Sequence, residues 1–293
     1  MARFTIWIVQ TLVDHHSRGF IEVAGGIAHA LRQLGHHVAF DPGRAGKIEN
    51  PLPGPDGKFG RLIVFGANRL PAIPLPEDAI VFNAEQVQTE GDQGDAWQAS
   101  SYVSLLRRHV VWDYSDANIE RLRAYGCERL VKCRVGYWPG LATVQPVERE
   151  DIDVLFVGSM NDRRVKVLQD CQRRGLRVQN LFGVYGEERD RFIARAKIVL
   201  NVHFYPQPVW EIFRVSHLLA NKKCVVTESG GADAELERLA ADTCAYVEYD
   251  QLATACQVLV RDDTRRRNLA ERGHERFKQI DQEAEVGRAF AAS

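Results

Sequence analysis

The sequence predicts an α/β fold of two consecutive domains, each with a parallel β-sheet and helices on both faces. Short β-branched and aromatic runs alternate with amphipathic helical segments along the chain. The 293 residues suffice for two domains of about 150 residues each. Residues 136–150, with two prolines and a charged end, interrupt the alternation. We therefore expect Rossmann-like domains at residues 1–140 and 150–293, separated by a ligand cleft, with the last helix packing back toward the first domain.

The first domain opens with a buried strand at residues 4–9 and a polar loop. A single apolar stripe at helical spacing then follows, formed by Phe20, Ala24, Ile27, Leu31 and Leu34. The Pro- and Gly-rich residues 42–60 predict a loop. The remaining strands are expected at residues 37–40, 61–66, 79–83, 109–112 and 129–135, and the remaining helices at 97–108 and 116–126.

The second domain repeats the alternation. Its strands are expected at residues 151–158, 176–183, 197–203, 223–229 and 243–249. Its helices are expected at residues 162–175, 186–196, 209–220, 233–240, 250–262 and 263–280. Strands and helices that alternate in this way form parallel sheets covered by helices.

Composition narrows the class of protein. The 38 basic and 39 acidic residues leave a net charge of −1, which argues against a polyanion-binding protein with a wholly basic surface and leaves a local basic groove open. The six cysteines form no C-x-x-C pair, and reduced thiols in a cytoplasmic protein are the simplest interpretation. The apolar run at residues 4–9 is too short to span a membrane.

The loops that follow strands carry the informative residues, because open α/β sheets bind ligands beyond the carboxyl ends of their strands. In the second domain these loops are "GSMNDRR" at 158–164, "GVYG" at 183–186 and "HFYPQPVWEIFR" at 203–214. Arg163 and Arg164 begin a helix and suit a phosphate group. Glu211 and Arg214 open an otherwise apolar helix, where charges are costly unless they have partners.

In this order the three loops resemble the nucleotide-sugar half of GT-B-fold glycosyltransferases, of the group-1 class and the CgeB-like spore-maturation proteins. The resemblance implies that the donor diphosphate lies at Gly158, Ser159, Arg163 and Arg164. It implies that Gly183, Val184 and Tyr185 lie along the nucleobase and that Glu211 holds the ribose hydroxyls. Arg214, His203 and Tyr205 are expected beside the sugar or the phosphates.

The first domain adds a further match, "RGFIEVAGGIAHALRQLGHHV" at residues 18–38. It resembles the first glycine turn and helix of the family, with Gly19 at the glycine ahead of the helix. Gly25 and Gly26 then fall inside the helix, despite a cost of about 1 kcal/mol for each glycine. We expect them to allow close packing against the sheet.

Candidates for a general base follow strands of the first domain. Asp14, His15 and His16 come after the first strand, and His or a carboxylate can take the proton of an acceptor hydroxyl. Glu85 and Asp113 also follow predicted strands. Each is a candidate acceptor ligand or base, and each also suits a helix or turn cap.

The resemblance implies a cytoplasmic, metal-independent, hexosyltransferase-like enzyme that uses a nucleotide diphosphate sugar, with UDP favoured, and no other cofactor. "DID" at 151–153 precedes a strand, at the wrong edge of the sheet for a metal-bound ligand. No G-x-G-x-x-G or P-loop motif is present. The acceptor stays open among small molecules, glycans, lipids, proteins and nucleic acids.

Two departures from the family pattern keep other functions open. Ser159 stands where the family often has a basic residue, and Leu219 stands where many members have a second Glu. Arg214 is a candidate replacement for that second Glu. A non-catalytic nucleotide-sugar or glycan-binding module is therefore an alternative, and so is a sugar-nucleotide epimerase of the same fold, which also binds UDP-sugars. Inversion or retention at the sugar, and the oligomeric state, also stay open.

Overall fold

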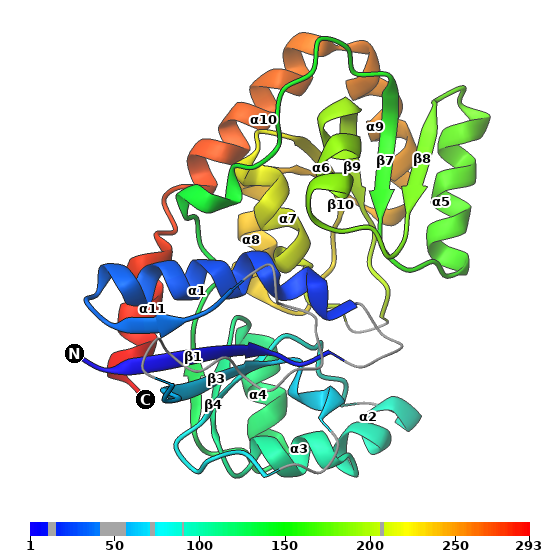
Figure 1. The fold of residues 1–293 in the computed structure, drawn as a ribbon. Coiled ribbons are helices and arrows are strands. Elements are labelled where there is room, and N and C mark those ends of the chain that lie inside the picture. The colour runs from blue at the N-terminus through cyan, green and yellow to red at the C-terminus, as the bar shows by residue number, and fades with distance from the viewer. Residues whose placement is uncertain (11–15, 42–56, 71–73, 90, 206–207) are drawn as a thin grey trace. The chain divides into compact units, whose positions relative to one another are not determined.

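The computed structural model describes residues 1–10, 16–41, 57–70, 74–89, 91–205 and 208–293 (Figure 1). They form two compact units. Unit 1 consists of Met1–Trp138 with Asp281–Ser293, and unit 2 consists of Pro139–Ile280. The chain thus passes from unit 1 to unit 2 within the interruption at residues 136–150 and returns for its last helix, α11 (Gln282–Ala291).

Unit 1 contains a six-stranded sheet in the order β2-β1-β3-β4-β5-β6, and every strand pair is parallel. Its strands are β1 (Arg3–Ile8), β2 (His37–Ala39), β3 (Arg61–Phe65), β4 (Ile80–Asn83), β5 (Val110–Asp113) and β6 (Leu130–Lys132). Its helices are α1 (Ile21–Gln33), α2 (Gly91–Gln98), α3 (Ser101–Leu106), α4 (Asp116–Ala124) and α11, with short turns η1 (His16–Phe20) and η2 (Ala67–Arg69).

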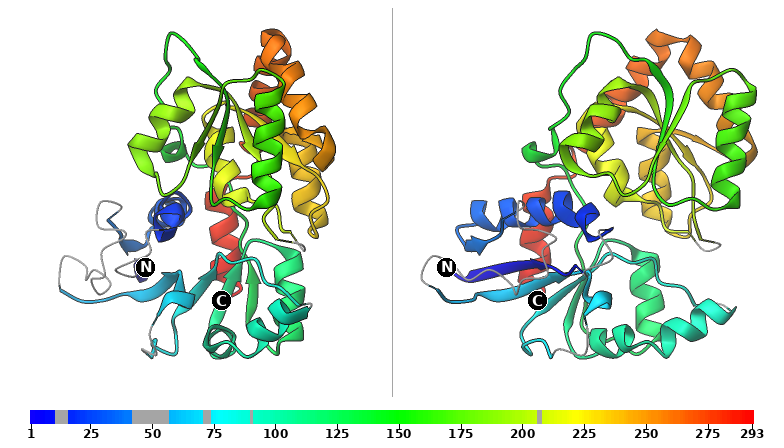
Figure 2. Two further views of the ribbon diagram at one scale, coloured as in Figure 1. Left: turned by 90° about the vertical axis from the view of Figure 1, so that its right-hand side faces the viewer. Right: turned by 45° about the vertical axis from the view of Figure 1, so that its right-hand side comes forward.

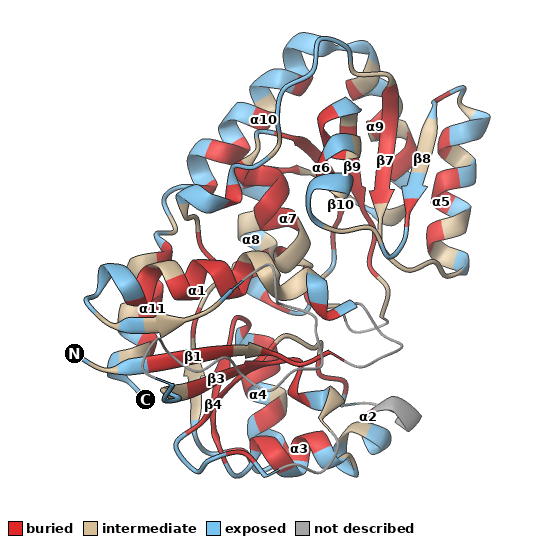
Figure 3. Cartoon of the chain, in the orientation of Figure 1, coloured by how far each residue is buried: buried red, intermediate tan, exposed pale blue. Residues whose placement is uncertain are grey.

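Helices cover both faces of this sheet (Figure 3). On one face α1 and α11 pack together, and the ring of Phe290 in α11 meets the ring of Phe4 in β1 at 5.4 Å between centroids. On the other face Val64 and Val111 share a buried apolar cluster with Val103 of α3 and Leu122 of α4. Strands β4 and β5 are buried at every residue, which is what a sheet covered on both faces requires.

The two helical glycines pack against an indole. A Cβ at Gly25 would lie 2.9 Å from Cζ2 of Trp138, and a Cβ at Gly26 would lie 2.8 Å from Cδ1 of the same ring. Both distances are shorter than any normal contact, so only glycine lets Trp138 lie this close to α1. The expected close packing is therefore present, but its partner is Trp138 and not the sheet.

The helix expected at residues 97–108 is divided into α2 and α3. The hydroxyl of Ser100 accepts a hydrogen bond from the backbone N–H of Val103 at 3.1 Å, which caps α3 at its N-terminus. A serine with extended backbone that caps a new helix also ends the preceding one. The helical periodicity of residues 97–108 concealed this break.

Unit 2 contains a five-stranded, fully parallel sheet in the order β11-β10-β9-β7-β8. Its strands are β7 (Ile152–Val157), β8 (Val178–Leu181), β9 (Ala196–Asn201), β10 (Cys224–Glu228) and β11 (Ala245–Val247). Its helices are α5 (Asp162–Arg173), α6 (Gly186–Arg195), α7 (Ile212–Ala220), α8 (Ala234–Thr243), α9 (Leu252–Arg261) and α10 (Asp263–Phe277), with turns η3 (Pro139–Leu141) and η4 (Tyr249–Gln251). Two parallel sheets with covering helices confirm the predicted fold class.

The sheet of unit 2 lies between two layers of helices (Figure 2). On one face Phe156 and Leu200 join a buried cluster with Val167 of α5 and Leu252 of α9. Helix α6 contacts β7 and β9, and α7 contacts β10. Strands β10, β9 and β7 are central neighbours, so the loops that follow them meet at one edge of the sheet.

Candidate functional site

The carboxyl edge of the unit 2 sheet gathers most of the predicted donor residues. Gly158 and Ser159 follow β7, His203 and Tyr205 follow β9, and Glu228 ends β10. Helix α5 starts beside them, and so does α7, of which Glu211 is the N-cap residue. The order of adjacent strands in the sheet thus assembles segments that are up to 70 residues apart, from Gly158 to Glu228.

The buried side chain of Arg164 links two loops at this edge by hydrogen bonds. Its Nε and one terminal nitrogen donate to the carbonyl of Val202 at 3.0 and 2.6 Å, and the other donates to the carbonyl of Ser159 at 2.9 Å. The side chain is 2% exposed, and burial together with the nearby Arg214 lowers its pKa to about 10. The guanidinium of Arg164 is thus enclosed and bonded to two loops, and its predicted contact with a phosphate stays a prediction.

Arg163 is partly exposed to solvent, whereas Arg164 is buried. The side chain of Arg163 is 42% exposed, and the guanidinium lies 4.3 Å from the ring centroid of Tyr249 and forms a two-nitrogen fork with the carboxylate of Glu228. The hydrogen bond with Glu228 raises the pKa of Arg163. Glu228 also accepts from the backbone N–H of His203 at 3.0 Å. Arg163 is thus a cation held in one orientation at the surface of the site.

Glu211 is the centre of a second network. Its carboxylate accepts from Nδ2 of Asn201 at 2.8 Å and lies 3.2 Å from Nδ1 of His203. Arg214 donates to Oδ1 of the same Asn201 at 3.1 Å. Burial alone would raise the pKa of Glu211, but the bond and charge of His203, with Arg214 and Asn201, outweigh it and hold the pKa at about 2. The carboxylate is therefore ionised and fixed at neutral pH.

His203 completes this network. Burial would lower its pKa, but its hydrogen bond to Glu211 outweighs burial and raises the pKa. The ring is 2% exposed, and within the described part of the chain its Nε2 has no hydrogen-bond partner. Glu211 thus favours the protonated, positively charged form of His203, in the loop that follows β9.

Backbone geometry brings Gly158 and Arg214 together. Gly158 has φ +154°, and a Cβ at this position would lie 3.3 Å from a terminal nitrogen of Arg214. The absent side chain gives the guanidinium room against the end of β7, where it lies 5.9 Å from the ring centroid of Phe156. A strand end without a side chain next to a cation is suited to an anionic ligand.

The loop predicted to contact a base lies after β8. Gly183 adopts φ +73°, and Tyr185 is the N-cap residue of α6. Gly183 is exposed and Val184 and Tyr185 are half-buried. Phe182, which sequence reasoning did not select, is 55% exposed at the same loop. Tyr205 is half-buried and packs edge-on against Phe204 at 5.1 Å.

The residues of unit 1 that the sequence predicts for the site lie in different environments. Asp14 and His15 lie outside the described residues, while His16 begins η1 and is exposed and Gly19 lies in the same turn, half-buried. Glu85 is partly exposed and pairs with Arg69 at 3.3 Å.

Asp113 is fully buried at the end of β5, where Asn83, Asn118 and the backbone N–H of Ser115 donate to its carboxylate. Burial raises the pKa of Asp113 to about 7 against these hydrogen bonds. The hydrogen bond from the backbone N–H of Ser115 fits the turn-capping alternative, and a direct role of Asp113 as acceptor ligand or base stays a prediction.

The "DID" segment forms ion pairs at the amino edge of the unit 2 sheet. Asp151 pairs with Arg195 at 2.7 Å, and Asp153 pairs with Arg177 and Lys197 at 2.9 and 3.0 Å. Within the described ranges, no group of three or more His, Cys, Asp or Glu side chains is arranged to hold a metal ion. No helix among those ranges has the length and apolar character needed to cross a membrane.

Sequence reasoning missed three residues of the unit 2 edge, Asn201, Glu228 and Tyr249, and in unit 1 it missed Arg69, the partner of Glu85. Asn201 and Glu228 are the last residues of β9 and β10. A polar residue that ends an apolar strand was a usable signal for both, since such a residue reaches the ligand edge of a parallel sheet. Tyr249 and Arg69 had no comparable sequence signal.

Comparison with protein families gives one match within the chain. Residues 141–282 match the family model described as Glycosyl transferase-like. Two uncharacterized proteins of Acanthamoeba polyphaga mimivirus are also similar. One is 33% identical over 107 residues, which cover 36% of this chain and 12% of the viral protein. The other is 28% identical over 133 residues, which cover 44% of each. The chain thus spans less than half the length of either viral relative.

Solved structures agree in fold. AviGT4, a glycosyltransferase involved in avilamycin A biosynthesis, superposes with a TM-score of 0.58 at 16% identity, covering 100% of this chain and 99% of that one. The T4 phage enzyme BGT, in its complex with UDP-glucose, gives a TM-score of 0.55 at 12% identity with the same coverage. The chain therefore has the α/β fold with two parallel sheets found in GT-B glycosyltransferases, and its unit 2 matches a glycosyl transferase-like family.

Proposed function

We propose that this protein is a glycosyltransferase that moves a sugar from a nucleotide diphosphate sugar to an acceptor hydroxyl, with UDP as the favoured carrier. The observation that carries the proposal is the fixed network of Glu211, His203, Asn201 and Arg214 beside Arg163, at the carboxyl edge of the unit 2 sheet. The glycosyl transferase-like match covers these residues. T4 phage BGT, which shares the fold, was solved with UDP-glucose.

The network contains the carboxylate and guanidinium groups that binding of a nucleotide-sugar donor requires. An ionised carboxylate such as Glu211 accepts hydrogen bonds from two neighbouring ribose hydroxyls. Arg163 and Arg214 provide guanidinium groups for the diphosphate, and both are oriented by partners before a ligand arrives. Preoriented cations stabilise the negative charge that develops on the leaving diphosphate, which lowers the barrier to transfer. We propose on this basis that transfer does not require a metal ion.

Unit 1 is proposed to bind the acceptor. Glu85, with Arg69 and Asn68, forms a partly exposed polar cluster after β3 and β4. A hydroxyl-bearing acceptor suits such a cluster, because the carboxylate accepts the hydroxyl proton and Arg69 and Asn68 donate to other oxygens. Asp113 supports the cluster from below through Asn83, whose Nδ2 also donates to the carbonyl of Glu85.

The test is a binding and turnover experiment with purified protein. UDP, TDP and a panel of UDP-sugars are titrated while the melting temperature is recorded, and release of UDP is then followed with and without chelator. Glu211→Gln and Arg163→Gln are expected to lower UDP affinity about tenfold or more, since each removes charge-assisted hydrogen bonds. Arg191→Gln, on an exposed surface pair of α6, is the matched control.

Four results would overturn the proposal. The first is that the wild type binds no nucleotide, and the second is that both site variants bind as tightly as the control. The third is conversion of the donor sugar to its epimer with no acceptor present, which would identify an epimerase. The fourth is binding without hydrolysis or transfer under any acceptor, which would identify a non-catalytic module.

A further inference from the structure

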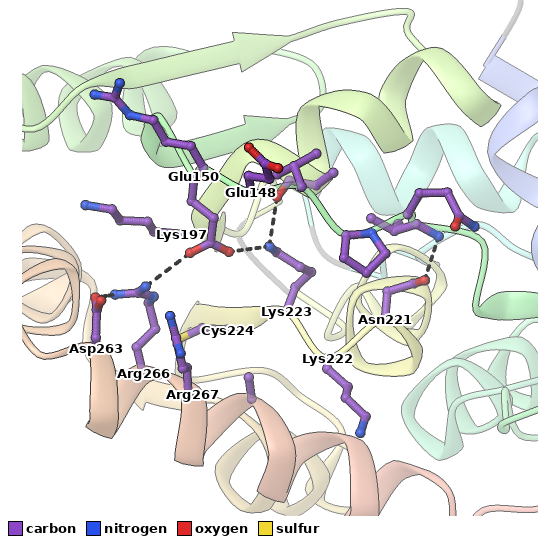
Figure 4. Close-up of a pocket in the computed structure, with 17 residues that line it drawn as sticks. Glu148, Glu150, Lys197, Asn221, Lys222, Lys223, Cys224, Asp263, Arg266 and Arg267 are labelled. Carbon is purple, nitrogen blue, oxygen red and sulfur yellow. Dashed lines mark hydrogen bonds and ion pairs between the residues drawn. The ribbon is translucent and has the colours of Figure 1, made fainter.

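A second charged pocket lies at the opposite, amino edge of the unit 2 sheet. Glu150 precedes β7, Lys197 is the second residue of β9, and Lys223 precedes β10, and all three line the pocket (Figure 4). Helix α10 forms another wall. The cavity volume is about 470 Å³, within the range of small-molecule sites. The proposed donor residues lie at the carboxyl edge of the same sheet, so the two sites are separate.

The pocket is lined by more positive than negative side chains. Six are basic: Arg149, Lys197, Lys222, Lys223, Arg266 and Arg267. Three are acidic: Glu148, Glu150 and Asp263. Lys197 and Lys222 are paired with carboxylates outside this set, at 3.0 Å to Asp153 and 2.9 Å to Glu271. The other basic side chains of the pocket are Arg149, Lys223, Arg266 and Arg267.

Two of these cations are buried and share one carboxylate. The side chains of Lys223 and Arg266 are 10% and 4% exposed. Nζ of Lys223 lies 2.9 Å from one oxygen of Glu150, and a guanidinium nitrogen of Arg266 lies 3.1 Å from the other. Arg266 also contacts Asp263. Buried cations are costly without an anion between them, and Glu150 occupies the position where that anion belongs.

Among the described residues this arrangement leaves two lining cations without a carboxylate partner, Arg149 and Arg267, and Arg267 is the one on α10 with Arg266. Its side chain extends from α10 toward the pocket (Figure 4). Within the described part of the chain it makes no hydrogen bond or ion pair, although Asp263 lies near enough to feel its charge. A guanidinium without a pair beside two buried cations creates a local excess of positive charge. An anion with several oxygens would satisfy all three groups at once.

We propose that this pocket binds the phosphate group of a small phosphorylated molecule, through Arg267, Arg266 and Lys223. Phosphate suits the set because guanidinium forks match its oxygens in pairs and an ammonium adds a point charge. The bounded volume favours a small molecule over a polymer, which would need an extended groove. Glu150 competes with the ligand for Lys223 and Arg266, so it weakens binding and keeps the empty pocket neutralised.

The experiment uses the full chain with inorganic phosphate and glycerol phosphate as probes, followed by calorimetry and by amide shifts in NMR. We expect a Kd on the order of 1 mM. Arg267→Ala is expected to weaken binding about tenfold, since it removes a charge-assisted fork. Arg265→Ala is the matched control, because it removes the same charge from the same exposed helix surface but lines a different cavity. Glu150→Gln is expected to bind phosphate more tightly than the wild type.

Tighter binding of glycerol phosphate than of inorganic phosphate would assign the site to phosphate esters, and equal binding would assign it to the free ion. The proposal fails if the wild type binds neither probe at about 20 mM, well above the expected Kd. It fails if Arg265→Ala and Arg267→Ala weaken binding equally, which would show a non-specific charge effect. It also fails if Arg163→Ala alone abolishes binding, because the probe would then occupy the proposed donor site.

Discussion

Glu211 and His203 form a buried pair in which the carboxylate lies 3.2 Å from Nδ1 of the imidazole. The two residues come from different elements, the N-cap of α7 and the loop after β9. Each stabilises the charged form of the other, so the pKa of Glu211 is lowered to about 2 and that of His203 is raised. A charged pair built in this way supports both the fold and the proposed donor site.

The pair predicts a pH window for stability. Glu211 stabilises the fold above its unfolded pKa of about 4.3, and this contribution is lost as the pH falls toward about 2. His203 stabilises the fold below its unfolded pKa of about 6.5, and this is lost as the pH rises through its higher folded pKa. Glu211→Gln should therefore lower the free energy of unfolding most between about pH 4.5 and 6.5, by about 3 kcal/mol.

Urea denaturation at acidic, intermediate and alkaline pH measures this window. Glu187→Gln is the control, since Glu187 forms an exposed pair with Arg191 on α6 and should change stability by no more than about 0.5 kcal/mol. A loss for Glu211→Gln that is constant with pH would show that the pair is not charged in the folded protein.

Gly158→Ala tests the link between backbone and cation. A Cβ at Gly158 would lie 3.3 Å from a terminal nitrogen of Arg214, and φ +154° disfavours a side chain. We expect Arg214 to shift and UDP affinity to fall about tenfold, with a loss of stability of about 1 kcal/mol. Gly175→Ala is the control, because φ is +80° there and a Cβ would meet no atom within 4 Å. Equal UDP affinity in both variants would separate Arg214 from donor binding.

The fold was predictable from the sequence because both sheets are buried on both faces. Strands such as β3 and β7 are nearly continuous apolar runs, and each is followed by a helical stripe or a glycine turn. The division of α2 from α3 was not predictable, since one hydroxyl at Ser100 overrides a continuous helical period. The contact of Gly25 and Gly26 with Trp138 joins residues more than 110 positions apart, which periodicity cannot report.

The position of the candidate residues at the sheet edge was predictable from the sequence, but the contacts of each side chain were not. A charged pair in an apolar helix indicated Glu211 and Arg214, and the structure gives both of them partners at the expected edge. Arg163 and Arg164 are adjacent and were equivalent in the sequence. The direction of each side chain on α5 decides that Arg163 is exposed and Arg164 is enclosed. Only the three-dimensional neighbours Glu228 and Val202 distinguish them.

The two arginines should respond differently to the same substitution. Arg164→Lys cannot donate to both Val202 and Ser159, so we expect a loss of about 2 kcal/mol in the free energy of unfolding. Arg163→Lys keeps an exposed charge and should cost less than about 1 kcal/mol, but it loses the fork and should weaken UDP binding. Denaturation and UDP titration of both variants give the comparison. Equal destabilisation by the two substitutions would contradict the bracing role of Arg164.

Asp113 predicts a second pH dependence, of opposite sign to that of Glu211. Burial raises its pKa to about 7 in the folded protein, against about 3.9 when unfolded. Between these values the folded chain holds a proton that the unfolded chain has lost, so stability falls as the pH rises, by at most about 1.4 kcal/mol per pH unit. Asp113→Asn cannot titrate, and its stability relative to the wild type should therefore increase from about pH 4 to 7 and then level off.

Chemical denaturation across this range, with the exposed Asp116→Asn as control, measures the difference. Parallel stability curves for the wild type and Asp113→Asn would show that the carboxyl group of Asp113 titrates at an ordinary pKa, and carbon NMR of that group would then report the same value.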